Sequence, residues 1–265
     1  MAIWEDFEID CTNYLNKKFG KYAEFVHCGG SDSTSPDILV KTAENSFYID
    51  AKHSPAQCGQ FVLFPDRKTR SFEYSRKNTA AKNKWSEKIM ECMNGDFDEF
   101  AAAGSTGRDI AVNDGQKIFS SWISDFYKEK NVKFFITNNF IIVPVEEISD
   151  YFEIKAKYRV KRSGSSSFGK NRVCRFSDFL GNNSLHDYKI TGVRAEGGKL
   201  FVSSERNLHR QSFSDGKNEY MFSYRNGEYE VRKLSGTYNA NVIFSIELRA
   251  SEGISDEEFI DYINN

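Results

Sequence analysis

The chain has 265 residues, of which 39% are hydrophobic and 28% are charged, and its formal net charge is −2. This length can bury a sizeable core and predicts one large domain or two to three small ones. Five scattered cysteines without a CxxC pair argue against a disulfide framework and against a zinc site. No apolar run approaches the roughly 20 residues that span a bilayer, and the acidic start "MAIWEDFEID" lacks the features of an export signal. We therefore expect a cytoplasmic protein.

The N-terminal segment predicts an amphipathic helix that ends at Gly20. Its apolar positions recur at three- and four-residue spacing: Trp4, Phe7, Cys11, Tyr14, Leu15 and Phe19. Glu8 lies at the margin of this apolar face. Its carboxylate is either a surface group or a polar group directed at a site under the sheet.

The next segments, up to residue 150, predict an α/β unit with a mixed sheet. "DILV" and "SFYID" are strands joined by the polar turn "KTAEN", and "SPAQCGQFVLFP" indicates a turn followed by a short element. Residues 75–95 and 114–131 have helical periodicity, and the second of these is strongly amphipathic. "VKFFIT" and "FIIVPV" form a hairpin whose turn contains Asn138 and Asn139.

After residue 150 the pattern changes to short β segments. Gly197-Gly198 and Asn226-Gly227 each lie between alternating strands and predict hairpin turns. A last helix begins at Ser255, and Glu258 completes a capping box. We infer an α/β domain over residues 1–150 and a β-rich, basic region over residues 151–265. The second region can itself divide into two lobes near residues 180–200.

Positive charge is concentrated in this second region. Residues 155–175 contain eight basic side chains and no acid. Such a stretch is either a solvated loop or a surface that meets a polyanion. Basic residues alternate with Ala156, Tyr158 and Val160, which indicates a strand with one basic face suited to a DNA backbone. The candidate DNA contacts here are Arg159, Lys161, Arg162, Ser163, Arg172 and Arg175.

The most informative motif is "PDILV…FYIDAK", which joins two acids and a lysine at the ends of neighbouring strands. Asp50 and Lys52 lie two residues apart, so both leave the same face of the strand, about 6.6 Å apart. Hairpin pairing can bring the carboxylate of Asp37 next to that of Asp50. Two close carboxylates repel unless a hard cation lies between them, and the carbonyl of Ala51 offers a further oxygen ligand. We therefore predict a site for a divalent metal ion formed by Asp37, Asp50 and Ala51.

The chemistry that this set favours is phosphodiester hydrolysis. Lys52 would stay charged beside the acids, orient or deprotonate a water molecule, and stabilise the extra negative charge of the reacting phosphate. Gln57 and Gln60 follow closely and either orient the nucleophile or a phosphate, or are plain surface amides. The four histidines show no metal-binding spacing, and His53 is more consistent with a surface or phosphate contact than with a general base.

The same block resembles the PD-(D/E)XK nuclease superfamily, here with Asp in the acidic position of "DAK". The longer run "SDSTSPDILV…FYIDAKHSPAQCGQFVLFPD", with "VKFFITNNFIIVPVE", "YRVKRSGS" and "NANVIFSIEL", resembles the HhaI type of type II restriction endonuclease. The residues that match the active-site pattern of the family are Asp37, Asp50 and Lys52. We also assign Glu8 and Gln60 to catalysis, and Ser33 and Gln57 to DNA contacts.

This resemblance implies a PD-(D/E)XK core with a mixed sheet, followed by DNA-recognition and DNA-gripping regions. It implies Mg²⁺-dependent cleavage of double-stranded DNA at a short palindrome, GCGC, with 5′-phosphate and 3′-hydroxyl ends. It also implies no membrane association, compatibility with action as a monomer, and a cognate DNA methyltransferase as a genetic partner only.

Two other hypotheses remain open at this level. One is a structure-specific nuclease of the same superfamily, such as a junction resolvase or a repair nuclease. The other is a non-catalytic DNA-binding protein in which the two acids and the lysine form an ordinary surface salt-bridge cluster. The long basic β-rich half favours an enzyme that reads a DNA sequence.

Overall fold

The computed structural model describes residues 3–29, 35–165, 173 and 188–264, with the side chains of 3–5 and 163–165 excepted. The backbone forms two compact units. The first unit contains residues Met1–Arg159 and Ala240–Asn265, and the second contains Val160–Asn239. The boundary predicted at residue 150 differs from this division, because residues 151–159 and 240–265 belong to the first unit. The assignment of catalysis and DNA recognition to separate regions stays a prediction.

The first unit is built around a five-stranded mixed sheet with the strand order β1-β2-β3-β7-β8. Only β3 and β7 run parallel, and the other neighbours are antiparallel. The predicted α/β class with a mixed sheet is therefore confirmed. The strands are β1 (Glu24–His27), β2 (Ile38–Lys41), β3 (Ser46–Lys52), β7 (Val132–Thr137) and β8 (Ile142–Pro144).

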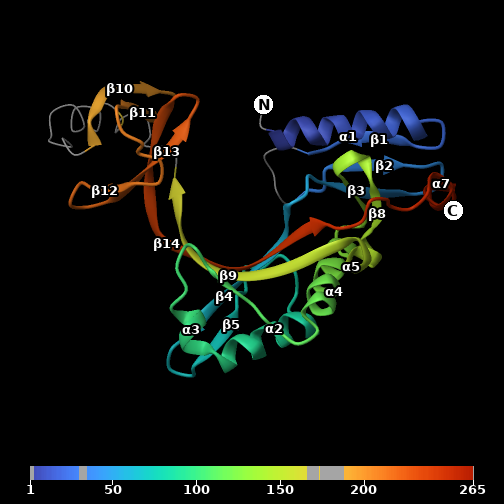
Figure 1. Cartoon of the computed structure of the whole chain (residues 1–265), viewed down its shortest axis with the longest axis horizontal. Coiled ribbons are helices and arrows are strands. Elements are labelled where there is room, and N and C mark those ends of the chain that lie inside the picture. Colours follow the sequence, from blue (N-terminus) through green and yellow to red (C-terminus); the bar gives the residue numbers. More distant parts are fainter. Residues whose placement is uncertain (1–2, 30–34, 166–172, 174–187, 265) are drawn as a thin grey trace. The chain divides into compact units, whose positions relative to one another are not determined.

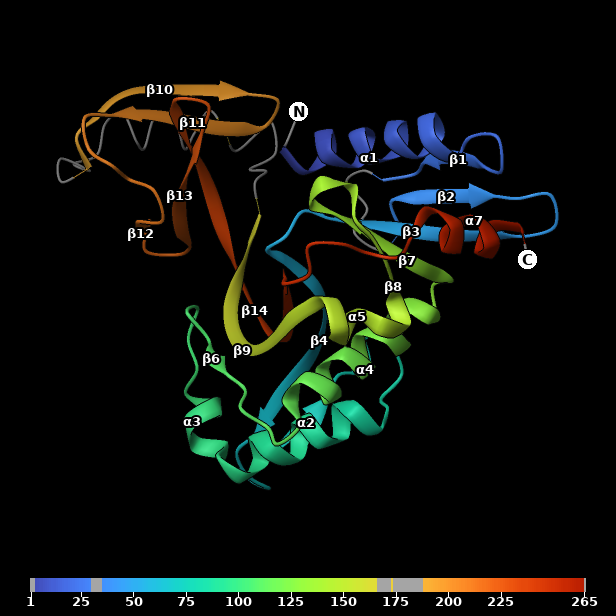
Figure 2. The ribbon, with the colours of Figure 1, turned by 45° about the vertical axis from the view of Figure 1, so that its right-hand side comes forward.

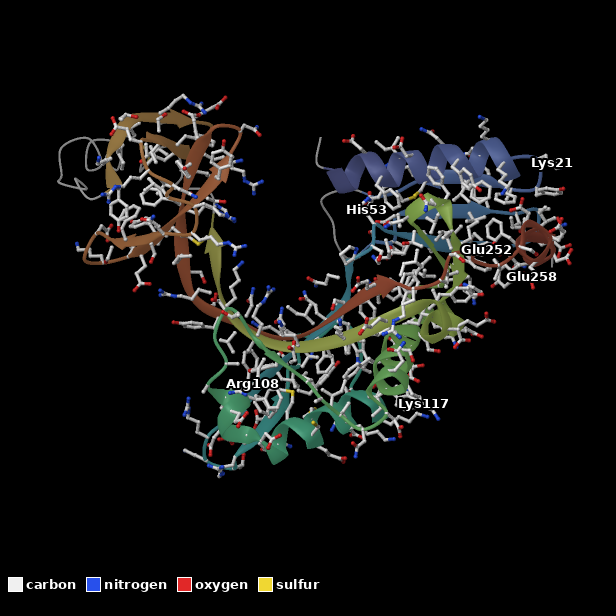
Figure 3. The ribbon with its side chains drawn as sticks, in the orientation of Figure 1. Lys21, His53, Arg108, Lys117, Glu252 and Glu258 are labelled. Carbon is white, nitrogen blue, oxygen red and sulfur yellow. The ribbon has the colours of Figure 1, made fainter. Side chains whose placement is uncertain are left out.

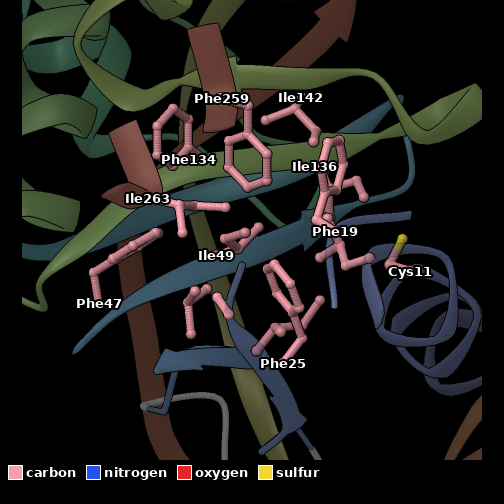
Figure 4. Packing of buried hydrophobic residues seen from close by; sticks show 14 residues of the cluster. Cys11, Phe19, Phe25, Phe47, Ile49, Phe134, Ile136, Ile142, Phe259 and Ile263 are labelled. Carbon is pink, nitrogen blue, oxygen red and sulfur yellow. The ribbon is translucent and has the colours of Figure 1, made fainter. Parts of the chain in front are cut away.

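Two helices, α1 (Ile3–Phe19) and α7 (Asp256–Asn264), cover one face of this sheet. Figures 1 and 2 show α1 running along the strands β1 and β2. Cys11, Leu15 and Phe19 recur every four residues and are all buried, as the helical period of the sequence predicts. They join the apolar side chains of the strands and of α7 in one core, which Figure 4 shows from close by.

The start of α7 has the predicted capping box. The backbone N–H of Ser255 donates to Oε2 of Glu258 at 2.8 Å, and the N–H of Glu258 donates to the hydroxyl of Ser255 at 3.2 Å. These contacts satisfy two donors that the first turn of a helix leaves unpaired.

The other face of the sheet carries α4 (Gly115–Lys128). Its apolar stripe packs on a second set of strands, where the indole of Trp122 stacks on Phe244 with 4.5 Å between ring centroids. Phe61 lies against both rings. The first unit also contains β4 (Ala56–Asp66), β5 (Ser71–Tyr74), β6 (Arg108–Asp109), α2 (Lys84–Gly95), α3 (Phe97–Ala101), α5 (Ile148–Tyr151), the 3₁₀ turns η1 (Asn138–Phe140) and η2 (Val145–Glu147), and parts of β9 (Phe152–Ser165) and β14 (Glu228–Leu248).

Two predicted elements differ from the structure. The short element expected after residue 54 is the 11-residue strand β4, because β4 pairs with the distant β14. The helix expected from residue 75 begins only at Lys84. Asn78 instead bonds the backbone of Val62 in both directions, and the side chain of Asn83 caps α2.

The second unit is an antiparallel sheet with the order β10-β11-β14-β13-β12. Both predicted hairpin turns are confirmed. Gly197 and Gly198 have φ values of 56° and 80°, and Asn226 and Gly227 have 49° and 90°. Two successive positive φ angles are what a two-residue hairpin turn of type I′ requires. The strands are β10 (Ile190–Glu196), β11 (Lys199–Ser204), β12 (Ser212–Ser214) and β13 (Glu219–Arg225), with the first part of β14.

None of the helices in the described part of the chain has the length and apolarity needed to cross a membrane.

Candidate active site

The hairpin of β2 and β3 brings the two predicted acids together. Ile38 pairs with Ile49, and both side chains are buried in the core under α1. Side chains alternate between the faces of a strand, so Asp37 and Asp50 lie on the opposite face, and Lys52 lies there with them. Continuing the register by one residue places Asp37 opposite Asp50.

The kind of pairing at this position decides how close the two carboxylates come. The carbonyl of Asp37 accepts the N–H of Cys28, the residue that follows β1, at 2.7 Å, so it points away from β3. The Asp37–Asp50 pair is therefore of the type without mutual backbone hydrogen bonds. In an antiparallel ladder this type brings the facing side chains closest, with Cα atoms about 4.5 Å apart.

The ladder between β2 and β3 ends at the next residue. The N–H of Ala51 donates to Oδ2 of Asp37 at 2.9 Å instead of to a strand partner. In an extended strand the N–H and C=O of one residue point to the same side, so the carbonyl of Ala51 also faces β2. There it would meet Pro36, which has no N–H to donate. Ala51 thus offers a backbone oxygen at the same edge as the carboxylate of Asp37.

The pair Asp50 and Lys52 forms a buried ion pair. The side chain of Lys52 is 14% exposed and that of Asp50 is 7% exposed. Oδ2 of Asp50 contacts the Lys52 ammonium ion but has no hydrogen bond of normal geometry among the described residues. Burial alone would lower the pKa of Lys52, but the negative charge of Asp50 beside it raises that pKa above its usual range. Lys52 therefore stays an ammonium ion.

Asp37 shows the repulsion that was expected between the two acids. Burial raises the pKa of its carboxyl to about 8, and the charge of Asp50 adds to this effect. The ammonium ion of Lys52 and the hydrogen bond from Ala51 act in the opposite direction and only partly compensate. If both acids were ionised, two carboxylates and one ammonium ion would leave an excess of negative charge, which the proton on Asp37 removes in the absence of a cation.

The donor atoms present here fit a magnesium ion. Carboxylate and carbonyl oxygens are hard ligands, and Mg²⁺ commonly uses one or two carboxylates and keeps several waters. No group of three or more His, Cys, Asp and Glu side chains forms a metal cluster within residues 3–29, 35–165 and 188–264. A cation at this site would therefore depend on the two aspartates and the Ala51 carbonyl, which is the predicted ligand set.

Residues of β7 and η1 fix the backbone that carries Lys52. The buried hydroxyl of Thr137 donates to the carbonyl of Lys52 at 2.6 Å. The side-chain amide of Asn138 bonds the N–H and the carbonyl of Ser54, at 2.9 and 2.8 Å. No local sequence pattern places these two residues at the site, because β7 pairs in parallel with the distant β3 and η1 follows β7 directly.

Glu8 and Gln60 have other hydrogen-bond partners than the central trio. Oε2 of Glu8 lies 3.1 Å from Nε2 of His27, and the buried carboxylate contributes to the raised pKa of Asp37. The carbonyl oxygen of Gln60 accepts hydrogen bonds from Asn241 at 2.9 Å and from Gln57 at 3.4 Å.

A bulge at Gly59 brings Gln57 and Gln60 to the same exposed face of β4. Gly59 has a φ of 88°, and a Cβ there would lie 2.8 Å from the ring of Trp122. Only glycine tolerates both conditions. Between the glutamines, Cys58 points inward, and burial raises the pKa of its thiol to about 12. His53, which is labelled in Figure 3, follows β3. Its ring packs edge-on against Phe7 of α1, with 5.0 Å between ring centroids.

Four of the predicted DNA contacts, Arg159, Lys161, Arg162 and Ser163, lie in β9. Ala156 and Tyr158 are buried, so the alternation of basic and apolar residues on this strand is confirmed. Lys157 pairs with Asp109 at 3.3 Å. Lys155 pairs with Glu153 at 3.2 Å.

The predicted contacts have different surroundings. Lys161 is exposed and Arg159 is partly buried. Arg162, in the second unit, forms an ion pair with Glu219 and lies over the ring of Tyr238. Ser33, Arg172, Arg175 and the side chain of Ser163 lie outside the described residues.

Comparisons with known proteins add the family. No family model and no curated protein matches this chain. A solved structure, HhaI endonuclease in complex with DNA, is similar over 99% of this chain and 99% of that chain, with 37% sequence identity and a TM-score of 0.78. The similarity extends over both units and confirms the resemblance inferred from the sequence. The chain belongs to the HhaI-like family of type II restriction endonucleases, and it is a site-specific nuclease.

Proposed function

We propose that this enzyme binds double-stranded DNA and hydrolyses both strands with Mg²⁺ at the palindrome GCGC, leaving 5′-phosphate and 3′-hydroxyl ends. The observation that carries the proposal is the convergence of Asp37, Asp50 and Lys52 on one face at the end of β3. Metal-assisted hydrolysis of a phosphodiester needs carboxylates for the cation and a positive charge for the phosphate. The similarity to HhaI endonuclease, whose structure was solved with DNA, supports DNA as the substrate.

Asp37, Asp50 and the carbonyl of Ala51 would hold the magnesium ion. When both acids are ionised, their negative charge exceeds what Lys52 compensates, and burial together with the charge of Asp50 raises the pKa of Asp37. The cation, when bound, supplies Lewis acidity to the phosphoryl group. Asp37 is then held as a carboxylate, still oriented by the N–H of Ala51.

Lys52 acts through its charge. Its raised pKa keeps the amine protonated, so it orients a water molecule by donating hydrogen bonds and does not remove a proton from it. The same ammonium ion stabilises the negative charge that develops on the phosphate in the transition state. The expectation that Lys52 deprotonates water is thus the less favoured of the two roles given above.

The basic residues of β9 support contact with a DNA backbone. Lys161 is exposed, and the buried side chains of Ala156 and Tyr158 fix which side of the strand the cations occupy. Lysine and arginine contacts to phosphates supply affinity that does not depend on the sequence and that falls with salt. The GCGC target follows from the sequence resemblance to the HhaI type and is proposed on that ground.

A plasmid cleavage experiment tests the proposal. The protein is incubated with supercoiled plasmid in Mg²⁺ or in chelator, and the ends are located by run-off sequencing. We expect discrete fragments with ends inside GCGC in Mg²⁺ and none in chelator. Discrete fragments with ends at another sequence would refute the GCGC target alone. Undiminished digestion in chelator would refute the metal mechanism.

Two matched variants separate catalysis from DNA binding. Asp50→Asn removes one charge from the site, and Glu44→Gln removes one charge from the exposed turn of the same hairpin. We expect Asp50→Asn to abolish cleavage while DNA affinity is unchanged or higher, because a negative charge near the phosphate is lost. Glu44→Gln should cleave normally. If Asp50→Asn cleaves at the wild-type rate, the assignment of the site is wrong.

A further inference from the structure

A buried tyrosine at the end of α4 contacts the proposed site without any role assigned to it so far. Tyr127 is 6% exposed, and its ring packs edge-on against Phe135 of β7, with 4.8 Å between ring centroids and an interplanar angle of 83°. The ammonium nitrogen of Lys52 lies 5.5 Å from the centroid of the Tyr127 ring. This distance is within the range of a cation–π interaction.

The hydroxyl of Tyr127 lies within reach of the side chains of Asp50 and Cys58, and burial together with the negative charge of Asp50 raises the pKa of this tyrosine well above its ordinary value. A phenol has one proton to donate, so it cannot donate to both partners at once. Cys58 is a fully buried thiol and stays protonated, so its S–H can donate to the phenol oxygen. The O–H of Tyr127 is then directed at Asp50. This order gives the hydroxyl of Tyr127 and the thiol of Cys58 a partner in a place where an unpaired polar group would be costly.

We propose that Tyr127 is a positioning residue of the active site, which holds Asp50 through its hydroxyl and Lys52 through the face of its ring. This inference rests on the proposed function. A lysine side chain has four flexible carbons, and a carboxylate can rotate, so both need fixed neighbours to act on a phosphate from one position. Tyr127 reaches both because α4 crosses the face of the sheet on which they lie.

The alternative is that Tyr127 is an ordinary core tyrosine whose hydroxyl has found a partner. Tyr158 provides the matched comparison within the same unit. It is fully buried, and its hydroxyl donates to the backbone carbonyl of Leu63 at 3.1 Å and not to a residue of the site. Tyr127→Phe and Tyr158→Phe each remove one buried hydroxyl and keep the aromatic ring. A purely structural role predicts the same behaviour for both.

The experiment measures three quantities for the full-length protein and for both variants. These are the single-turnover cleavage rate at saturating DNA, the affinity for DNA in Ca²⁺, and the rise in melting temperature caused by Mg²⁺ without DNA. For Tyr127→Phe we expect cleavage to slow about tenfold, the order of one hydrogen bond to a charged group. DNA affinity should change less than about twofold, and the Mg²⁺-induced rise should become smaller because Asp50 is less well oriented.

Tyr158→Phe should lower the melting temperature and leave the cleavage rate and the Mg²⁺ effect unchanged. If Tyr127→Phe behaves in the same way as Tyr158→Phe, the positioning role is wrong. Asp50→Asn, measured alongside, distinguishes this failure from a failure of the proposed function. An inactive Asp50→Asn together with a normal Tyr127→Phe overturns only the inference about Tyr127, whereas a fully active Asp50→Asn overturns the site itself.

Discussion

The raised pKa of Asp37 makes the stability of the metal-free protein depend on pH. The carboxyl has an ordinary pKa of 3.8 and a folded pKa of about 8. The folded protein therefore keeps a proton that the unfolded chain releases between these values. The stabilisation is fully present below pH 3.8 and is lost as the pH rises through about 8, so stability should fall with increasing pH.

The magnitude follows from 1.36 kcal/mol for each pKa unit. Between about pH 5 and about pH 8, the upper limit for the loss is roughly 4 kcal/mol. Water entry and local relaxation reduce such burial penalties in real proteins, and we expect about 2 kcal/mol. Asp37→Asn removes the titrating group and keeps an oxygen that can accept the N–H of Ala51, so this part of the pH dependence should disappear.

The assay is urea unfolding in chelator, followed by tryptophan fluorescence. All three tryptophans of the chain lie in the first unit, so the signal reports the unit that contains the site. Glu44→Gln is the control for removing a carboxylate from the same hairpin, and it should retain the wild-type pH dependence. If Asp37→Asn loses stability with pH as steeply as the wild type, the buried proton is not on Asp37 and the electrostatic account of the site is wrong.

Three further predictions concern other parts of the molecule. Gly59→Ala should destabilise the protein by about 2–4 kcal/mol in urea unfolding, because φ is 88° and the new Cβ would lie 2.8 Å from the indole ring of Trp122. Unchanged stability would show that the bulge can relax. Thr137→Val keeps the shape of the side chain but leaves the carbonyl of Lys52 without its hydroxyl donor, so the free energy of unfolding should fall by about 1–3 kcal/mol. An equally stable variant would mean that this hydrogen bond contributes little. Glu219→Gln removes the ion pair of Arg162, so the affinity for DNA at low salt, measured by fluorescence anisotropy, should rise about two- to fivefold. An unchanged affinity and salt dependence would argue against a DNA contact by Arg162.

Local patterns predicted the parts of the fold that depend on neighbouring residues. The first helix follows from the four-residue spacing of Cys11, Leu15 and Phe19, and both type I′ hairpins follow from glycine and asparagine at their turns. The strand β4 could not be sized in this way. Its partner is β14, so the pairing of Gln60 with Ile243 connects residues that are far apart in the chain. The membership of residues 240–265 in the first unit could not be predicted for the same reason, because it depends on the long-range pairing of β14 with β4.

The same distinction applies to the site. Asp37, Asp50 and Lys52 could be placed on one face from the alternation of two adjacent strands joined by a short turn. Tyr127 and Thr137 could not, because they reach the site through the helix α4 and the parallel pairing of β3 with β7. In the sequence, Tyr127 looks like one more apolar position of an amphipathic helix. The only available signal was a hydroxyl on an otherwise apolar stripe, which is too common to indicate a function.

The register of one hairpin connects the folding of this protein with its chemistry. The turn before β3 is fixed by Thr42, whose N–H donates to the carbonyl of Asn45 at 2.9 Å and whose hydroxyl accepts the N–H of Asn45 at 2.9 Å. A slip of one residue would turn Ile49 out of the core and put Asp50 into it. This slip is unfavourable because it exposes an apolar side chain to water and buries a carboxylate among apolar neighbours. The apolar core therefore selects the one register in which the two carboxylates face each other. The charged pair is unfavourable by itself without a cation, and the burial of its apolar neighbours on the other face holds it in place.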